Sequence, residues 1–137
     1  MVNGVYDTGR AAFLNAGINW TSDNIKAVLI NTASYTVNLS THAFLSDIAA
    51  GARAATSANL TTKTSTAGVA DAADITFSAV PTGPACGAYV LYKDTTVATT
   101  SQLICYVDTV ASGLPVTPNG GDITVTFDNG TNKIFKL

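Results

Sequence analysis

The chain has 137 residues, of which 47% are hydrophobic and only 12% charged, and its formal net charge at pH 7 is −2. This length fits one domain that can bury a core without disulfides or metals, so we predict a single β domain over residues 1–137. The seven scattered Lys and Arg residues make no basic patch, which argues against nucleic acid as a partner. No apolar run approaches the roughly 20 residues of a membrane-spanning helix, which argues against a membrane partner.

The residue usage favours β structure. Glutamate is absent, and other long-chain helix formers are scarce, whereas the many Thr, Val, Ile and aromatic residues fit pleated, half-buried surfaces. We therefore expect an all-β fold, a single-domain β-sandwich or jelly-roll-like barrel with a short N-terminal helix. The N-terminal segment also lacks the basic head and apolar run of a secretory signal, which predicts a protein made and kept in the cytoplasm.

The first predicted element is a short helix over Thr8–Ala16. Asp7 or Thr8 can cap its first turn, and Gly17 can end it. The apolar run Ile25–Asn31, bounded by turn residues on both sides, predicts a buried strand. The stretch Ser40–Ile48 begins with capping residues and predicts one helical turn that plugs one end of a sheet.

The segment Ala49–Gly68 is rich in small residues, and Leu60 is its one large apolar anchor. It fits a loosely specified edge strand, a long surface loop, or an arm that orders only on a partner. We favour an extended arm with one or two short strands. Alternating or apolar patterns then predict five further strands: Asp74–Val80, Cys86–Lys93, Gln102–Thr109, Asp122–Phe127 and a terminal strand over 133–137.

The two cysteines, Cys86 and Cys105, are predicted to be buried free thiols. If the turn of the hairpin formed by Cys86–Lys93 and Gln102–Thr109 is centred near Val97 and Ala98, opposed residue numbers sum to about 195. Cys105 then faces Val90, and Cys86 lies too far along the ladder for a disulfide. A longer or bulged turn would change this register.

Catalytic chemistry needs convergent titratable groups, and the sequence is short of them. His42 is the only histidine, and we expect it to make a local bond beside Ser40 and Thr41. One histidine and two distant cysteines do not make a zinc site. Asp71 and Asp74 fit turn hydrogen bonds better than a pair of catalytic carboxylates. We predict no enzyme activity, no cofactor, and no catalytic, cofactor-binding or metal-binding residues.

The hairpin poses the main question about function, because both of its faces are apolar. The predicted register places Tyr89 opposite Tyr106 and Leu91 opposite Ile104 on the second face. Cross-strand pairs of this kind stabilise a hairpin by only about 0.2–1 kcal/mol each, so the face needs cover. Either the chain itself supplies that cover, through the N-terminal helix or the Ala49–Gly68 segment, or the four residues form a candidate protein interface between subunits.

Five segments carry a family resemblance: Ile25–Leu29, Ser34–Tyr35, Thr41–Asp47, Tyr89–Thr95 and Leu103–Asp108. In these, the chain resembles small structural proteins encoded among the virion genes of tailed bacteriophages. The resemblance extends over roughly two thirds of the chain. It departs at Ala49–Thr66, where the family pattern has a Gly-Tyr-Thr-Ala-Gly-Gly stretch, and this departure puts any shared contact of the central segment in doubt.

The resemblance implies a structural role. It implies a capsid decoration (cement) protein that binds and stabilises the shell through protein–protein contacts, with the major capsid protein or other virion proteins as partners. It also implies a homo-oligomer, a trimer or hexamer, located in the virion and assembled in the cytoplasm of the bacterial host. The alternative is a tail or head-fibre component, or an adhesion module that binds a host-surface receptor or glycan.

Overall fold

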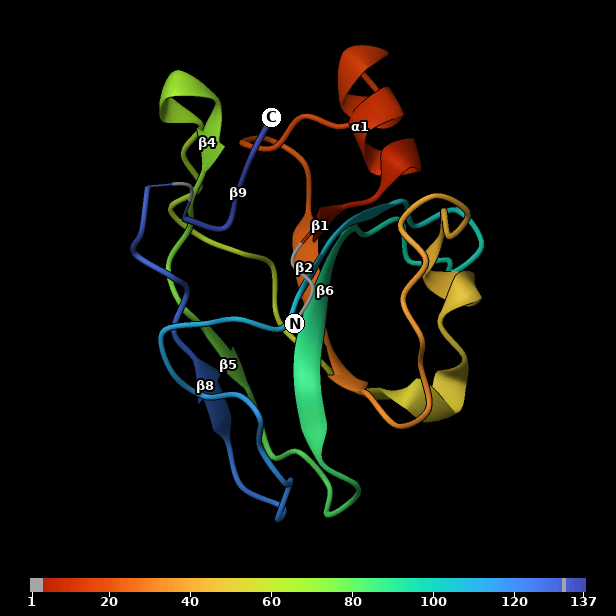
Figure 1. The fold of residues 1–137 in the computed structure, drawn as a ribbon, viewed down its shortest axis with the longest axis vertical. Helices are drawn as coiled ribbons and strands as arrows, with labels where there is room; N and C mark the ends of the chain where they lie inside the picture. The colour runs from red at the N-terminus through yellow and green to blue at the C-terminus, as the bar shows by residue number, and fades with distance from the viewer. Residues whose placement is uncertain (1–3, 132) are drawn as a thin grey trace.

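The structure is a computed structural model that describes residues 4–131 and 133–137. It is mostly β, with antiparallel sheets and one short α-helix, as predicted (Figure 1). The elements are β1 (Gly4–Val5), α1 (Asp7–Leu14), β2 (Ile25–Asn31), β3 (Arg53–Thr56), β4 (Val69–Ala70), β5 (Ile75–Phe77), β6 (Cys86–Lys93), β7 (Leu103–Val107), β8 (Ile123–Val125) and β9 (Phe135–Lys136), with 3₁₀ turns at Leu45–Asp47, Ala50–Ala52 and Thr66–Gly68.

Five strands form the main sheet in the order β1-β7-β6-β2-β3, and every pairing in it is antiparallel. Two small antiparallel pairs, β4-β9 and β5-β8, lie to one side of the main sheet (Figure 1). Among the residues that the structure describes, these sheets do not close into a barrel.

Both faces of the main sheet are buried, which explains why its central strands are continuous apolar runs rather than alternating ones. On one face, Leu29 and Tyr89 belong to a core cluster with the β5 and β8 side chains. On the other face, Val28 and Val90 pack with residues of the 35–52 segment. Figure 1 shows this segment and the β5-β8 pair on opposite sides of the sheet.

The hairpin of β6 and β7 forms within the predicted residues. Its predicted register is correct beside the turn, at Tyr92 and Leu103, but is wrong by one residue from Leu91 away from the turn. Tyr89 pairs with Val107, Val90 with Tyr106, and Leu91 with Cys105. The register then shifts between Leu91 and Tyr92, which pairs with Leu103. The bulge lets Ile104 and Cys105 both face the cluster that contains Tyr89, while Tyr106 lies on the opposite face of the sheet.

The Ala49–Gly68 segment adds an edge strand to the main sheet, one of the three forms that its composition allowed. Its strand β3 pairs with β2, with Ala55 opposite Leu29. Beyond β3, Ser57 and Ala27 exchange two hydrogen bonds, from the Ala27 amide to the Ser57 hydroxyl at 2.9 Å and from the Ser57 amide to the Ala27 carbonyl at 2.8 Å. Leu60 is buried in the core. The chain itself therefore holds this segment in place.

The helix α1 spans Asp7–Leu14, close to its predicted bounds, but its predicted cap is wrong. Tyr6 precedes the helix, and no side chain caps it. The Asp7 amide donates instead to the Leu39 carbonyl, and the Thr8 hydroxyl donates to the His42 carbonyl. The predicted turn in Ser40–Ile48 is present as the 3₁₀ turn Leu45–Asp47.

Candidate functional site

The four residues predicted as a candidate protein interface are buried inside the single chain. The exposed fractions are 1% for Tyr89, 0% for Leu91 and Ile104, and 6% for Tyr106. The sheet pairing also separates them, because Tyr106 faces away from the other three. Of the two alternatives for the hairpin, cover from within the chain is the one observed, and these side chains offer no surface to a partner.

Both predicted parts of the chain supply some of this cover, since Leu60 of the Ala49–Gly68 segment shares the core cluster of Tyr89 and Ala52 shares that of Tyr106. Other parts of the chain contribute as well. The Tyr89 ring packs against Phe127, which follows β8, with ring centroids 5.7 Å apart. Tyr106 packs against Tyr35 at 6.3 Å. The predicted helix does reach the hairpin, since Ala12 and Phe13 pack against the same core cluster as Tyr89.

His42 forms the outer end of a hydrogen-bonded chain of three side chains. Its Nδ1 lies 2.7 Å from the Tyr35 hydroxyl, which lies 2.9 Å from the hydroxyl of Tyr6. We predicted a local bond beside Ser40 and Thr41, and the observed partner is Tyr35. Burial raises the pKa of both tyrosines above the usual value. The two hydroxyls are therefore neutral at physiological pH and tie α1 to the 35–42 segment.

The two cysteines are buried free thiols, as predicted. Burial raises the pKa of the Cys105 thiol to about 12, so it stays protonated and unreactive.

The carboxylates checked for catalysis have separate structural roles, because Asp71 pairs with Lys133 and Asp74 accepts a hydrogen bond from the Phe127 amide. Within the described residues, no three Cys, His or acidic side chains gather as metal ligands. Nor does any described helix have the length and apolarity to cross a bilayer.

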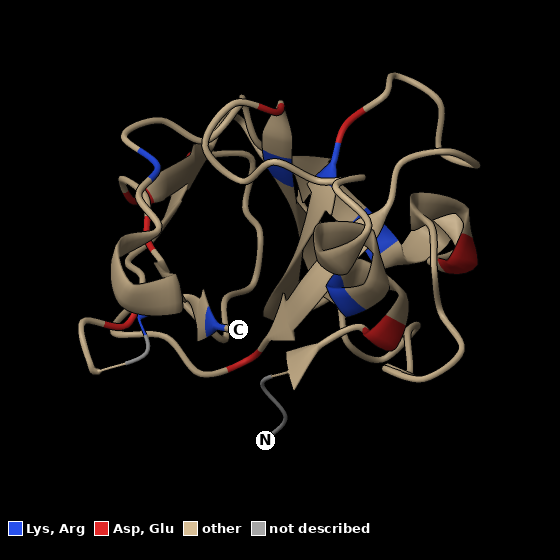
Figure 2. Ribbon diagram, turned by 90° about the horizontal axis from the view of Figure 1, so that it is seen from above, with Lys and Arg blue, Asp and Glu red and all other residues tan. Residues whose placement is uncertain are grey.

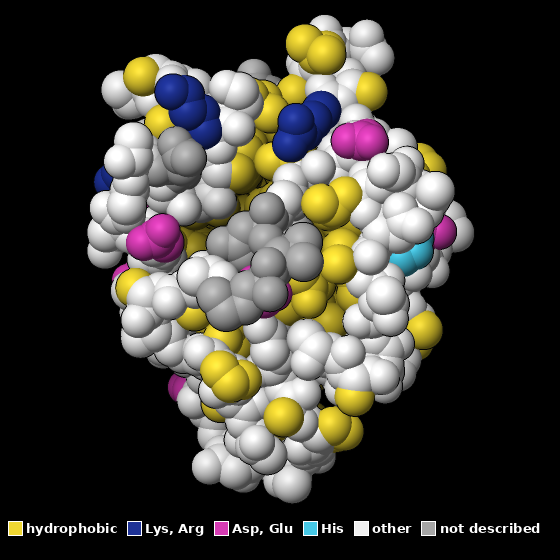
Figure 3. Space-filling model, in the orientation of Figure 1, with side chains coloured by type: hydrophobic (Ala, Val, Ile, Leu, Met, Phe, Trp, Pro, Cys, Tyr) yellow, Lys and Arg dark blue, Asp and Glu magenta, His cyan; other side chains and the backbone are white. Residues whose placement is uncertain are grey.

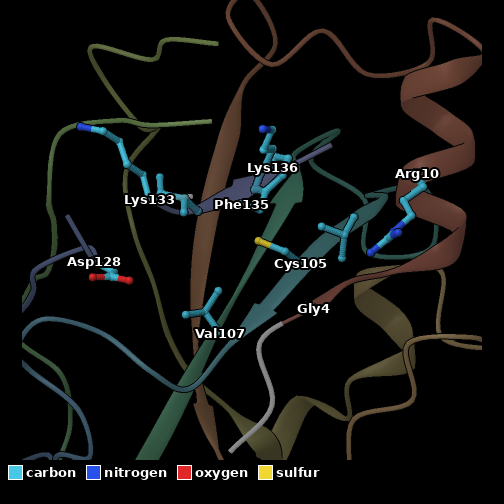
Figure 4. A pocket seen from close by; sticks show the side chains of 10 residues that line it. Gly4, Arg10, Cys105, Val107, Asp128, Lys133, Phe135 and Lys136 are labelled. Carbon is cyan, nitrogen blue, oxygen red and sulfur yellow. The ribbon is translucent and has the colours of Figure 1, made fainter. Parts of the chain in front are cut away.

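A hollow on the surface lies between α1, β7 and the C-terminal strand β9. It has a volume of about 300 Å³. Figure 4 shows Arg10 of α1 on one side, Asp128 and Lys133 on the other, and Lys136 between them. Cys105 and Val107 of β7 form its apolar floor, and Phe135 also lines it. We call this the cationic hollow.

Two of its three cations have no partner. The Lys133 ammonium lies 3.2 Å from an Asp71 carboxylate oxygen, but neither Arg10 nor Lys136 makes an ion pair or a side-chain hydrogen bond within the described part of the chain. Most lysines elsewhere are paired, as Lys26 is with Asp94 and Lys93 with Asp23. The hollow thus carries two cations that no described acidic side chain pairs, together with the carboxylate of Asp128.

A smaller, apolar hollow adjoins the first, because Phe135 lines both. Its volume is about 150 Å³, and Phe13, Trp20 and Leu137 line it. Trp20 lies edge-on to Phe135 with ring centroids 5.3 Å apart, and its Nε1 donates to the Thr64 carbonyl at 2.9 Å. We call this the apolar hollow.

Large apolar side chains are exposed in the wall of this second hollow and at the end of α1. Leu137, in its wall, is 57% exposed, and Leu14, which follows Phe13 at the end of α1, is 87% exposed. In Figure 3, apolar atoms line the depression between the part of the molecule that carries α1 and the part that carries β4 and β9, with Lys or Arg side chains near its upper rim.

Comparison with known proteins adds no further residue to this description. Neither a protein-family model nor a curated protein matches the chain.

Sequence reasoning missed both hollows because their walls come from opposite ends of the chain. The one available signal was the C-terminal segment, in which two lysines alternate with apolar residues although charge is sparse elsewhere.

Proposed function

We propose that this chain is a structural component of a tailed-phage virion, of the capsid decoration (cement) type, which binds and stabilises the shell through protein–protein contacts. The resemblance of its strand segments to virion proteins supports this role. So does the tight bonding of the 49–68 segment to β2, because a cement protein needs a rigid body. We propose a binding role rather than a catalytic one, with the major capsid protein or another virion protein as the partner.

One observation carries the proposal: two hollows with complementary chemistry adjoin each other on one surface. Interfaces between proteins combine apolar and aromatic side chains with arginine and a polar rim. The apolar hollow supplies the half-buried Phe13 and the exposed Leu137, and the cationic hollow supplies Arg10 and Lys136. Exposed apolar groups beside unpaired cations are the composition of a surface that a protein partner covers.

We also propose that the fold is a β-sandwich, with β5 and β8 as part of a second layer over the main sheet. The contacts of β5 and β8 support this arrangement, because Phe77 and Val125 share a core cluster with Leu29 and Tyr89. An experimental structure of the purified chain tests it. Aligned layers packed about 10 Å apart are expected for a sandwich.

The location in the virion is the first test of function. Gold-labelled antibodies raised against the purified chain are applied to intact particles and viewed by electron microscopy. Label distributed over the head is the expected result. Label confined to the tail or to fibres would favour the alternative, a tail or head-fibre component or an adhesion module, and binding to a glycan array would then identify its receptor chemistry. Particles without any label would contradict both.

The oligomeric state is the second test. Decoration proteins act in many copies around symmetry axes, so we propose a trimer or hexamer. Light scattering at several concentrations measures the mass in solution, and a discrete trimer or hexamer is expected. A monomer at every concentration would contradict this part of the proposal and leave assembly to the shell.

A further inference from the structure

We propose that the cationic hollow binds an acidic side chain of a neighbouring protein, presented on an extended segment whose apolar residue two positions away enters the apolar hollow. This inference rests on the proposed function, because it names the chemistry of the partner that the decoration protein would contact. It goes beyond that function by assigning a ligand to a site that the chain leaves charged and open.

The charge of the hollow requires an anion. Three cations line it, against the single carboxylate of Asp128. Asp71 pairs with the Lys133 ammonium at 3.2 Å, and Arg10 and Lys136 share the hollow with the Asp128 carboxylate, so one positive charge is left in excess. A carboxylate held between Arg10 and Lys136 gains a pair of charge-assisted hydrogen bonds, and the planar guanidinium of an arginine suits a carboxylate in particular.

The size of that charge favours a carboxylate over a polyanion. Nucleic acid is bound by extended basic surfaces that neutralise many phosphates. Here the chain as a whole has a net charge of −2, and Figure 2 shows its Lys and Arg residues spread over separate strands, helix and loops. Two unpaired cations above an apolar floor of Cys105 and Val107 match one or two acidic side chains flanked by apolar ones.

The position of the two hollows favours an extended segment. They share Phe135 as a common wall, so a ligand that fills both passes directly over this residue. Side chains of an extended chain point alternately to opposite faces and rise by about 3.3 Å per residue. An acidic residue and an apolar residue two positions away therefore lie on the same face, about 7 Å apart, as a segment lying across both hollows requires.

A peptide titration tests the site without any virion. The probe is an acetylated and amidated heptapeptide, Ser-Asp-Ser-Val-Ser-Asp-Ser, in which Asp and Val two positions apart lie on the same face of an extended chain, and its control replaces each Asp by Asn. Amide chemical shifts of the ¹⁵N-labelled chain report both the affinity and the place of binding. Shifts at Arg10, Val107, Phe135 and Lys136 are expected with the Asp peptide and not with the Asn peptide. Raising the salt concentration from about 0.01 M to about 0.1 M shortens the Debye length from about 30 Å to about 10 Å and is expected to weaken binding.

Matched variants localise the charge. The double variant Arg10→Gln with Lys136→Gln is expected to weaken binding of the Asp peptide by about tenfold, because it removes two exposed ion pairs, each of which contributes modestly. The control, Lys26→Gln with Lys93→Gln, makes the same change in net charge outside the hollow and is expected to bind as the wild type does. The dispersion of the same amide spectra shows whether each variant folds.

Several results would overturn the inference. These are an absence of shifts at the hollow, equal binding of the Asn peptide, or unchanged affinity in the Arg10 and Lys136 variant. Tighter binding of inorganic phosphate or of a short single-stranded DNA at these residues would make the site one for phosphate instead. If only the proposed function is wrong, the result is different: the Asp peptide still binds the hollow, but the gold-labelled antibodies do not label the virions.

Discussion

Gly9 of α1 lies directly against the carbonyl oxygen of Leu103 in β7, so that a Cβ atom added to Gly9 would lie 2.7 Å from that oxygen. Alanine normally stabilises a helix interior by about 1 kcal/mol relative to glycine. Here the contact is with backbone, which yields less readily than a flexible side chain. We therefore expect Gly9→Ala to lower the free energy of unfolding by about 1–3 kcal/mol, the usual cost of overpacking.

Urea denaturation measures this effect, and Gly51→Ala is the matched control, because nothing lies within 4 Å of a Cβ at Gly51. The control variant is expected to be as stable as the wild type within about 0.5 kcal/mol. A Gly9→Ala variant that equals or exceeds the wild type in stability would show that α1 does not pack this closely on β7.

The burial of the hairpin predicts that its residues contribute to folding and not to association. Leu91 is fully buried, whereas Leu14 is 87% exposed. Leu91→Ala is expected to lower the free energy of unfolding by about 2–5 kcal/mol, and Leu14→Ala by less than about 0.5 kcal/mol. Chemical denaturation of the two variants at low protein concentration checks this. If Leu91→Ala left stability unchanged, the hairpin face would not be covered by its own chain.

The hydroxyl chain from Tyr6 through Tyr35 to His42 predicts an order of stability. Tyr35→Phe leaves the fully buried Tyr6 hydroxyl without a partner, which costs about 1–3 kcal/mol. Tyr6→Phe removes its own hydroxyl and leaves Tyr35 bonded to His42, at a cost of about 0.5–1.5 kcal/mol. Thermal unfolding of both variants at neutral pH measures the difference. A larger loss in Tyr6→Phe than in Tyr35→Phe would contradict the arrangement.

Asp47 predicts a dependence of stability on pH. Its Oδ2 accepts hydrogen bonds from the Ala43 and Phe44 amides at 2.7 and 3.0 Å, and these lower the pKa of the carboxyl. Because the folded-state pKa lies below the unfolded value of about 3.9, the stabilisation is complete above the unfolded pKa and is lost as pH falls through the folded pKa.

The variant Asp47→Asn is therefore expected to be less stable at pH 7 and to lose less stability than the wild type on acidification below about pH 4. Urea denaturation across this range measures both effects. Identical dependence on pH in the two proteins would mean that Asp47 contributes nothing through its charge.

The strands of the main sheet were predictable because their apolar character is continuous. The segments Ile25–Asn31 and Cys86–Lys93 form β2 and β6 over the predicted residues. The hairpin register was not predictable, because it depends on a bulge beside Leu91. It also depends on a long turn in which the Thr95, Thr100 and Ser101 hydroxyls bond to one another, and such bonds are not visible in a residue pattern.

The candidate site could not be predicted for a different reason. Arg10 and Lys136 lie near opposite ends of the chain, and only the packing of α1 and β9 beside β7 brings them to one hollow. Local patterns indicate elements, but they do not say which loops and termini meet. The hairpin drew attention because it is apolar on both faces, and the structure accounts for that pattern because core clusters cover both faces of the main sheet.

Binding to the phage head tests the central claim most directly. Particles assembled without the chain are mixed with increasing amounts of the purified wild-type protein or of the Arg10→Gln and Lys136→Gln double variant, and the protein that sediments with the particles is measured. Saturable binding of the wild type to heads, with weaker binding of the double variant, is the predicted result. Wild-type protein that stays in the supernatant at every concentration would contradict the proposed decoration role.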